Sequence, residues 1–125
     1  MTDSQPQRQR FTRQQRLKRP ADFRAIFKTA RRVSDDHLIL YARFNRLGRS
    51  RLGVGVGKKL GSAVVRNRYK RTLREAFRSA YPDLPAGYDL VLIPRSTDHC
   101  SSRRYKESLL TLIRRWQRRN TPKKN

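Results

Sequence analysis

Cysteine, acidic residues and long apolar runs are scarce in this chain of 125 residues. Its 1 cysteine excludes an internal disulfide and a cysteine-based zinc finger. No run of about 20 apolar residues is present to cross a membrane, and no apolar stretch near the start is typical of a secretory signal. We therefore expect one cytoplasmic domain with a small hydrophobic core.

The few carboxylates limit the chemistry that the polypeptide can do. The chain has 9 acidic residues, scattered except for Asp35 and Asp36 in a predicted turn, whereas metal-dependent phosphodiester cleavage needs several converging carboxylates. A metal-free nuclease would need paired histidines, and neither His37 nor His99 has an evident mate. His99 and Cys100 are neighbours whose side chains would point apart in a strand, so they do not indicate a metal site. We predict no catalytic residue and no metal ligand in this chain.

Glycines near residue 55 suggest a nucleotide-binding loop, but their spacing does not fit one. A P-loop needs glycine where Leu52 stands and serine or threonine where Lys59 stands. Gly53 lies in a predicted strand, where glycine more often marks the close approach of another part of the chain.

Positive charge is the strongest signal in the sequence. The chain has 32 Lys+Arg against 9 Asp+Glu, a formal net charge of +23, and such a charge destabilises a compact chain by self-repulsion. Binding to a nucleic acid neutralises the charge and releases condensed counterions. A membrane surface is the alternative polyanion, but a membrane-surface helix needs a broad apolar face, and the apolar residues here are used in a core. The charge therefore predicts a nucleic-acid partner and no membrane.

Composition divides the chain into a body and two basic tails. Residues 1–15 are rich in glutamine and arginine and are expected to be disordered in the free protein, and residues 117–125 form a second polar tail, which leaves 16–116 as a single domain. Periodicity in that domain predicts helices over 20–30, 62–80 and 101–116, and strands near 33 and over 37–45, 51–56 and 88–93. This order, α-β-β-β-α-β-α, predicts an α+β sandwich with a central four-stranded mixed sheet flanked by helices.

The helix predicted over 62–80 separates apolar from basic residues. Glu75 is its only acidic residue, whereas an ordinary solvated helix mixes charges of both signs. Like charges one turn apart repel, and guanidinium groups suit phosphate because their donors bind two oxygens at once. The apolar arc, which can pack on a sheet, holds Val65, Tyr69, Leu73, Ala76, Phe77 and Ala80. The opposite side, which we expect to contact phosphates, carries Asn67, Lys70, Arg71, Arg74 and Arg78, with Arg66 and Arg68 near the borders.

Two adjoining segments carry a recognisable motif. Residues 64–77, VVRNRYKRTLREAF, contain Arg-Asn-Arg, and residues 55–63, GVGKKLGSA, precede it with Lys-Lys-Leu-Gly. Together they resemble the signature of the bacterial ribonuclease P protein family, although Gly57 stands where that family favours a small polar residue. Weaker similarity includes Asp22, Phe23 and Phe27 of the first helix and the strands over 38–41 and 90–95. The resemblance covers roughly residues 16–116.

The resemblance implies the protein subunit of a ribonucleoprotein endonuclease that removes the 5′ leader from precursor tRNA. In this family the RNA subunit carries out catalysis and holds Mg²⁺, so we expect no cofactor on the polypeptide alone. The implied partners are the ribonuclease P RNA subunit and precursor tRNA, with no protein partner required. The implied fold includes a left-handed β-α-β crossover around the Arg-Asn-Arg helix, which departs from the usual right-handed rule.

The residue pattern and the resemblance together select two groups of binding residues. Phenylalanines at i and i+4 ordinarily pack a helix on its sheet, but this family places aromatic residues of the first helix and of the strand over 37–45 in a leader cleft. There their rings stack on unpaired bases. The expected RNA-subunit contacts are Arg66, Asn67, Arg68, Lys70, Arg71 and Arg74. The expected leader contacts are Phe23, Phe27, Tyr41, Lys58 and Lys59, with Tyr41 on the strand face opposite Leu38, Leu40, Ala42 and Phe44.

A structural RNA-binding protein, such as a ribosomal protein, is the main alternative function. Its size, charge and basic tails would be the same, but it would not account for the Arg-Asn-Arg helix, the upstream Lys-Lys-Leu-Gly and the aromatic first helix together. A DNA-compacting protein would not need the aromatic positions.

Overall fold

The computed structural model describes residues 15–17, 19–95 and 100–120. Its elements confirm the predicted order α-β-β-β-α-β-α, with two short 3-10 helices, η2 and η3, before and after the second long helix. They are α1 (Pro20–Thr29), β1 (Arg31–Ser34), β2 (Leu38–Phe44), β3 (Arg51–Val54), η2 (Lys58–Leu60), α2 (Ala63–Ala80), η3 (Tyr81–Asp83), β4 (Tyr88–Pro94) and α3 (Ser102–Asn120).

The four strands form one mixed sheet in the order β1-β2-β4-β3. The β1–β2 and β2–β4 pairs are antiparallel, and Leu40 lies opposite Leu92. β3 pairs with β4 in parallel, so α2 is the crossover of a β-α-β unit. The central position of β4 explains its nearly continuous burial, because a strand covered on both faces has no polar side. The left-handedness of the crossover stays a prediction.

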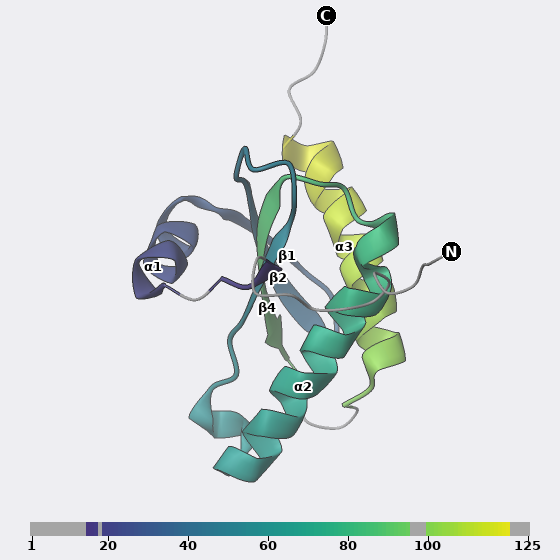
Figure 1. Ribbon diagram of the computed structural model, residues 1–125. Coiled ribbons are helices and arrows are strands. Elements are labelled where there is room, and N and C mark those ends of the chain that lie inside the picture. The colour runs from purple at the N-terminus through teal and green to yellow at the C-terminus, as the bar shows by residue number, and fades with distance from the viewer. Residues whose placement is uncertain (1–14, 18, 96–99, 121–125) are drawn as a thin grey trace, which may run out of the picture.

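Helices cover both faces of the sheet (Figure 1). α2 and α3 lie on one face and enclose the larger core, which includes Leu38, Leu40 and Leu92. α1 lies on the other face, where Ile26 packs with Leu17 and Val91. The alternation predicted for β2 is confirmed, because Leu38, Leu40 and Ala42 are buried in the first core whereas Tyr41 is half-buried on the opposite face.

The structure extends or shortens some predicted segments. β3 ends at Val54, two residues before the predicted end at 56, and α3 continues to Asn120, so residues 117–120 of the expected C-terminal tail form its last turn. The remainder of that tail and residues 1–14 lie outside the described residues. Phe44 shares the inward face of β2 but is 55% exposed, because it lies at the strand end, where its ring contacts Tyr88 and Trp116. No described helix is long and apolar enough to span a membrane.

Local hydrogen bonds define the turns and the start of α2. The Asp35 carboxylate accepts from the backbone N–H groups of His37 and Leu38 at 2.8 and 2.9 Å, which confirms the turn predicted before β2. Ser62 caps α2, because its hydroxyl accepts from the Val65 N–H at 3.3 Å. The helix on which the basic residues lie is therefore fixed at its first turn.

A buried ionic cluster joins the strands at one end of the sheet. Asp89 of β4 is fully buried, and Arg51 of β3 donates to its two carboxylate oxygens at 2.8 Å each. Arg43 of β2 donates at 3.2 Å, and the Asn45 amide at 2.9 Å. Burial by itself raises the pKa of Asp89, but the hydrogen bonds from Arg51, Asn45 and Arg43 outweigh burial and hold the pKa below its ordinary value. Asp89 is therefore an ionised carboxylate inside a strongly basic protein.

Asp89→Asn should destabilise the fold, because it leaves Arg51 and Arg43 without their shared counterion. Removing one partner of a buried ion pair costs about 3–5 kcal/mol, and we expect the lower end because the two arginine side chains are 20% and 27% exposed. The free energy of unfolding, measured by urea titration, reports this loss. Asp36→Asn at an exposed turn position is the matched control and should cost much less.

The same carboxylate predicts a pH dependence. Its folded pKa lies below the unfolded value of about 3.9, so its contribution is complete above that pH and is lost as the pH falls through the folded pKa. The unfolding free energy of the wild type should therefore decline more steeply below about pH 4 than that of Asp89→Asn. Parallel pH profiles for the two proteins would contradict this assignment.

Candidate RNA-binding surfaces

The predicted division of α2 into two faces is confirmed. Tyr69, Leu73 and Phe77 are buried against the sheet and α3, and Val65 packs at the edge of that core. The six residues predicted to bind the RNA subunit lie on the remaining surface of the helix, and we call them the α2 ridge. Within the ridge Asn67, Arg68 and Arg71 are exposed, whereas Arg66, Lys70 and Arg74 are half-buried.

The ridge has little compensating charge. Glu75 is the only acidic residue of α2, and its carboxylate lies 3.8 Å from the Arg78 guanidinium, one turn further along. Arg66 donates to the Gly61 carbonyl at 3.3 Å, which directs that side chain back towards the start of the helix. The arrangement brings several guanidinium groups onto one rigid surface, which is the chemistry that contacts with phosphate require.

The structure joins two of the predicted leader residues into an aromatic pair, Phe27 of α1 and Tyr41 of β2. Their ring centroids are 4.9 Å apart and their planes lie at 84°, an edge-to-face contact. Phe27 is 46% exposed, so a large part of its ring is open to solvent. A hollow of about 640 Å³ beside Phe27 is also lined by Arg24, Ala25 and Lys28, which places positive charge next to the exposed ring.

Phe23 has a different environment from Phe27, although the two lie one turn apart. Phe23 packs against the small core under α1, and its ring lies over Gly53 of β3. A Cβ atom on Gly53 would lie 2.6 Å from the ring carbon Cζ, so only glycine fits here without displacing the ring. The prediction that Gly53 marks a close approach is confirmed. Phe23 therefore packs in the small core under α1 and, unlike Phe27, is only partly exposed.

Lys58 and Lys59 lie in η2, between β3 and α2, and both side chains are exposed. η2 packs against α2 and leads into its first turn. These lysines therefore lie beside the start of the α2 ridge, and β4 separates β3, which precedes them, from the β2 strand that carries Tyr41.

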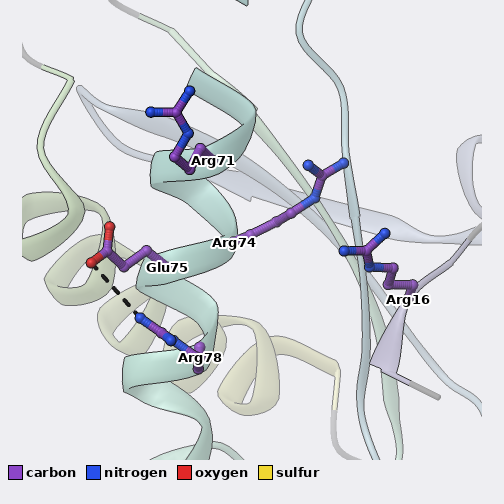
Figure 2. A pocket seen from close by; sticks show the side chains of 5 residues that line it. All are labelled: Arg16, Arg71, Arg74, Glu75 and Arg78. Carbon is purple, nitrogen blue, oxygen red and sulfur yellow. Dashed lines mark ion pairs between the residues drawn. The ribbon is translucent and has the colours of Figure 1, made fainter. Parts of the chain in front are cut away.

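Sequence reasoning missed a cluster of arginines that tertiary structure brings together. Arg16 lies next to β3, because the Leu17 N–H donates to the Leu52 carbonyl at 2.8 Å and residue 16 forms a parallel bridge with Leu52. Figure 2 shows Arg16 and the α2 residues Arg71, Arg74 and Arg78 around one pocket, with the Glu75–Arg78 ion pair at its lower side. No spacing in the sequence relates Arg16 to α2, so only the strand pairing reveals the cluster.

Among the described residues, the titratable groups outside these surfaces show no arrangement typical of catalysis. Within the described residues, no three His, Cys, Asp or Glu side chains come together as metal ligands. The Cys100 thiol lies 3.3 Å from the Thr72 hydroxyl, and the His37 ring lies 3.4 Å from Arg104. His99 lies outside the described residues.

These features define a class: a small, strongly basic α+β protein with a cationic helix on one face of its sheet and an aromatic pair, with Phe27 exposed, on the other. The Ribonuclease P family model matches residues 11–117. The Ribonuclease P protein component of Clostridium kluyveri is 46% identical over 89 residues, which is 70% of this chain and 80% of that protein. The Thermotoga maritima protein of the same description is 37% identical over 110 residues, or 84% and 94% of the two chains.

Solved structures agree with the sequence relatives. The RNase P protein of Thermotoga maritima superposes with a TM-score of 0.72 at 35% identity, covering 80% of this chain and 96% of that one. The RNase P protein of Staphylococcus aureus gives 0.71 at 31% identity, covering 82% and 95%. The chain belongs to the bacterial ribonuclease P protein family, the protein components of a tRNA-processing ribonucleoprotein, and its partner is ribonuclease P RNA.

Gly53→Ala tests whether Phe23 is seated against β3. The added methyl group collides with the ring, and overpacking of this kind costs about 1–3 kcal/mol. Urea unfolding should show that loss. Gly57→Ala is the matched control, because a Cβ there meets nothing within 4 Å, and it should leave stability nearly unchanged. Equal stability of the two variants would mean that the ring does not occupy this position.

Proposed function

We propose that this chain binds the RNA subunit of ribonuclease P through the α2 ridge and the 5′ leader of precursor tRNA through the aromatic pair. By holding both RNAs it promotes the Mg²⁺-dependent removal of the leader. The observation that carries the proposal is the separation of two chemically different surfaces on one small domain. The α2 ridge lies on the side of the sheet that α2 and α3 cover, and the aromatic pair lies on the side that α1 covers.

The α2 ridge suits a folded RNA because its charges are fixed. Five turns of helix, capped at Ser62 and anchored by Tyr69, Leu73 and Phe77, hold the guanidinium groups at constant spacing. A rigid array loses less conformational entropy on binding than mobile side chains on a loop. Contacts with phosphates carry no sequence information, so the shape of the RNA backbone selects the partner.

The aromatic pair suits an unpaired strand of varied sequence. Every base has a π-face, so stacking on an exposed ring tolerates any base. Phe27 offers such a ring, Tyr41 holds it in place by the edge-to-face contact, and Arg24 and Lys28 beside it match the phosphates of the strand. Lys58 and Lys59, exposed in η2 between β3 and α2, add positive charge beside the start of the α2 ridge.

The chemical step belongs to the RNA subunit in this proposal. Mg²⁺ prefers carboxylate and other oxygen ligands in octahedral geometry, and the part of the chain that the structure describes brings no group of three acidic or histidine side chains together. Its side chains therefore do not fit a Mg²⁺ site made by the polypeptide. In this proposal the RNA subunit holds the ion, and the protein binds and orients the substrate.

Reconstitution tests the function directly. Precursor tRNA is incubated at low Mg²⁺ concentration with bacterial ribonuclease P RNA, with the protein, and with both. We expect cleavage at the mature 5′ end only when both are present. Cleavage by the protein alone would contradict the non-catalytic role, and binding to the RNA without stimulation would instead favour a structural RNA-binding protein.

Phe27→Ala tests the leader surface in the reconstituted complex. Loss of one base-stacking contact should weaken binding of precursor tRNA by about 1–3 kcal/mol and leave binding of mature tRNA, which has no leader, nearly unchanged. Phe44→Ala is the matched control, because Phe44 is also exposed but lies at the far end of β2 beside Trp116. Equal losses for the two tRNAs in Phe27→Ala would remove the leader assignment.

A further inference from the structure

The pocket of arginines in Figure 2 lies where the N-terminal segment meets α2. Its volume is about 460 Å³, and its lining residues are Arg16, Arg71, Arg74, Glu75 and Arg78. Four of these five side chains are cationic, and the one carboxylate, Glu75, is directed to Arg78. Such a concentration of positive charge is unfavourable unless an anion occupies the space.

Two of these arginines are held close together by elements far apart in the sequence. The backbone of Arg16 is fixed by its bridge to Leu52 and by the burial of Leu17, which is only 5% exposed. Arg74 is fixed by α2 and is half-buried. Burial lowers the pKa of Arg74, and the charge of Arg16 lowers it further. The fold therefore keeps these two positive charges near each other around the same cavities.

Arg16 and Arg74 also lie where two cavities meet. A smaller cavity of about 160 Å³ is lined by both of them, by Lys70, and by apolar groups that include Phe23 and Gly53. The larger pocket lies on the α2 side of the two arginines and the smaller one lies on the α1 side. A group bound between them would be reached by guanidinium donors from two directions, with Lys70 beside it.

We propose that Arg16 and Arg74 together bind one phosphate group of an RNA backbone, so that the N-terminal segment completes a phosphate site on α2. This inference rests on the proposed function and adds Arg16 to the RNA-binding residues. Each guanidinium presents a planar fork of donors, and one phosphate has enough acceptor oxygens for two forks. The bound phosphate replaces repulsion between the two arginines by attraction to a shared anion.

The phosphate of a polymer fits the surroundings better than a free ion. The pocket is continuous with the α2 ridge through Arg71, and a chain of phosphates passing along the helix would bring the next group towards that side chain. Inorganic phosphate has the same local chemistry, so the experiment separates the two sources.

A double-mutant cycle tests the shared site. Arg16→Gln, Arg74→Gln and the double variant are compared with wild type for binding to ribonuclease P RNA across a series of chloride concentrations. Each single variant should lose about tenfold in affinity. The magnitude of the slope of log K against log salt should fall by about 0.9, the value for one lost phosphate contact. Because both arginines hold the same phosphate, the double variant should lose clearly less than the product of the single losses.

Control variants exclude a general effect of charge or of folding. Arg114→Gln removes the same charge from an exposed position on α3. When it is combined with Arg74→Gln, the fold-loss in RNA affinity should equal the product of the two single losses. Arg16→Lys keeps the charge but loses the fork, so it should recover only part of the affinity. Thermal unfolding of the free protein tests for a merely structural role, in which the fall in Tm of Arg16→Gln would by itself account for the weaker RNA binding.

Three results would overturn the proposal that Arg16 and Arg74 share one RNA phosphate. Losses that multiply fully in the double variant would mean two separate contacts. A lower Tm for Arg16→Gln that accounts for its weaker binding would mean a structural role. Stabilisation by millimolar inorganic phosphate that depends on both arginines, with RNA binding unaffected by either, would mean a site for a free ion. Failure of the wild type to stimulate cleavage would refute the proposed function itself, which these binding measurements do not test.

Discussion

The carboxylate of Asp89 holds together the three strands from which the rest of the molecule is built. β4 is the central strand that carries it, Arg43 reaches it from β2, and Arg51 reaches it from β3. β3 is short and pairs along only one edge with another strand, so its position depends strongly on this contact. α2 follows β3, and Leu17 pairs with β3, so the cationic helix and the arginine pocket both depend on where that strand lies. In a chain of net charge +23, one enclosed anion offsets repulsion at the point where three strands meet.

Segregation of charge allows so basic a chain to have a core at all. The apolar stripe of α2 and the inward residues of α3 cover one face of the sheet, and a single short helix covers part of the other. The basic side chains are left on the outer surface of α2 and around α1, where a polyanion can reach them. The two proposed RNA contacts differ in chemistry for this reason: a wide helix face offers many guanidinium groups, whereas the thinly covered sheet face leaves aromatic rings accessible.

Phe23, Phe27 and Phe44 show how far sequence patterns reach. Helical spacing places Phe23 and Phe27 on the same side of α1, and alternation places Phe44 with the core residues of β2. In the folded protein Phe23 rests on Gly53, Phe27 is open beside Tyr41, and Phe44 is open at the end of its strand. Periodicity defines the face that a residue shares with its neighbours. The length of the opposing element decides whether that face is covered at a given residue.

The sequence by itself determined the element order, the two faces of α2 and the family. Each of these follows from local periods or from a contiguous motif. Tertiary structure alone decided the burial of Asp89 and the meeting of Arg16 with Arg74. These depend on contacts between residues tens of positions apart, and such contacts are set by how the helices pack on the sheet around a shared core. A sequence pattern with the period of a strand or a helix carries no information about which distant elements pack together.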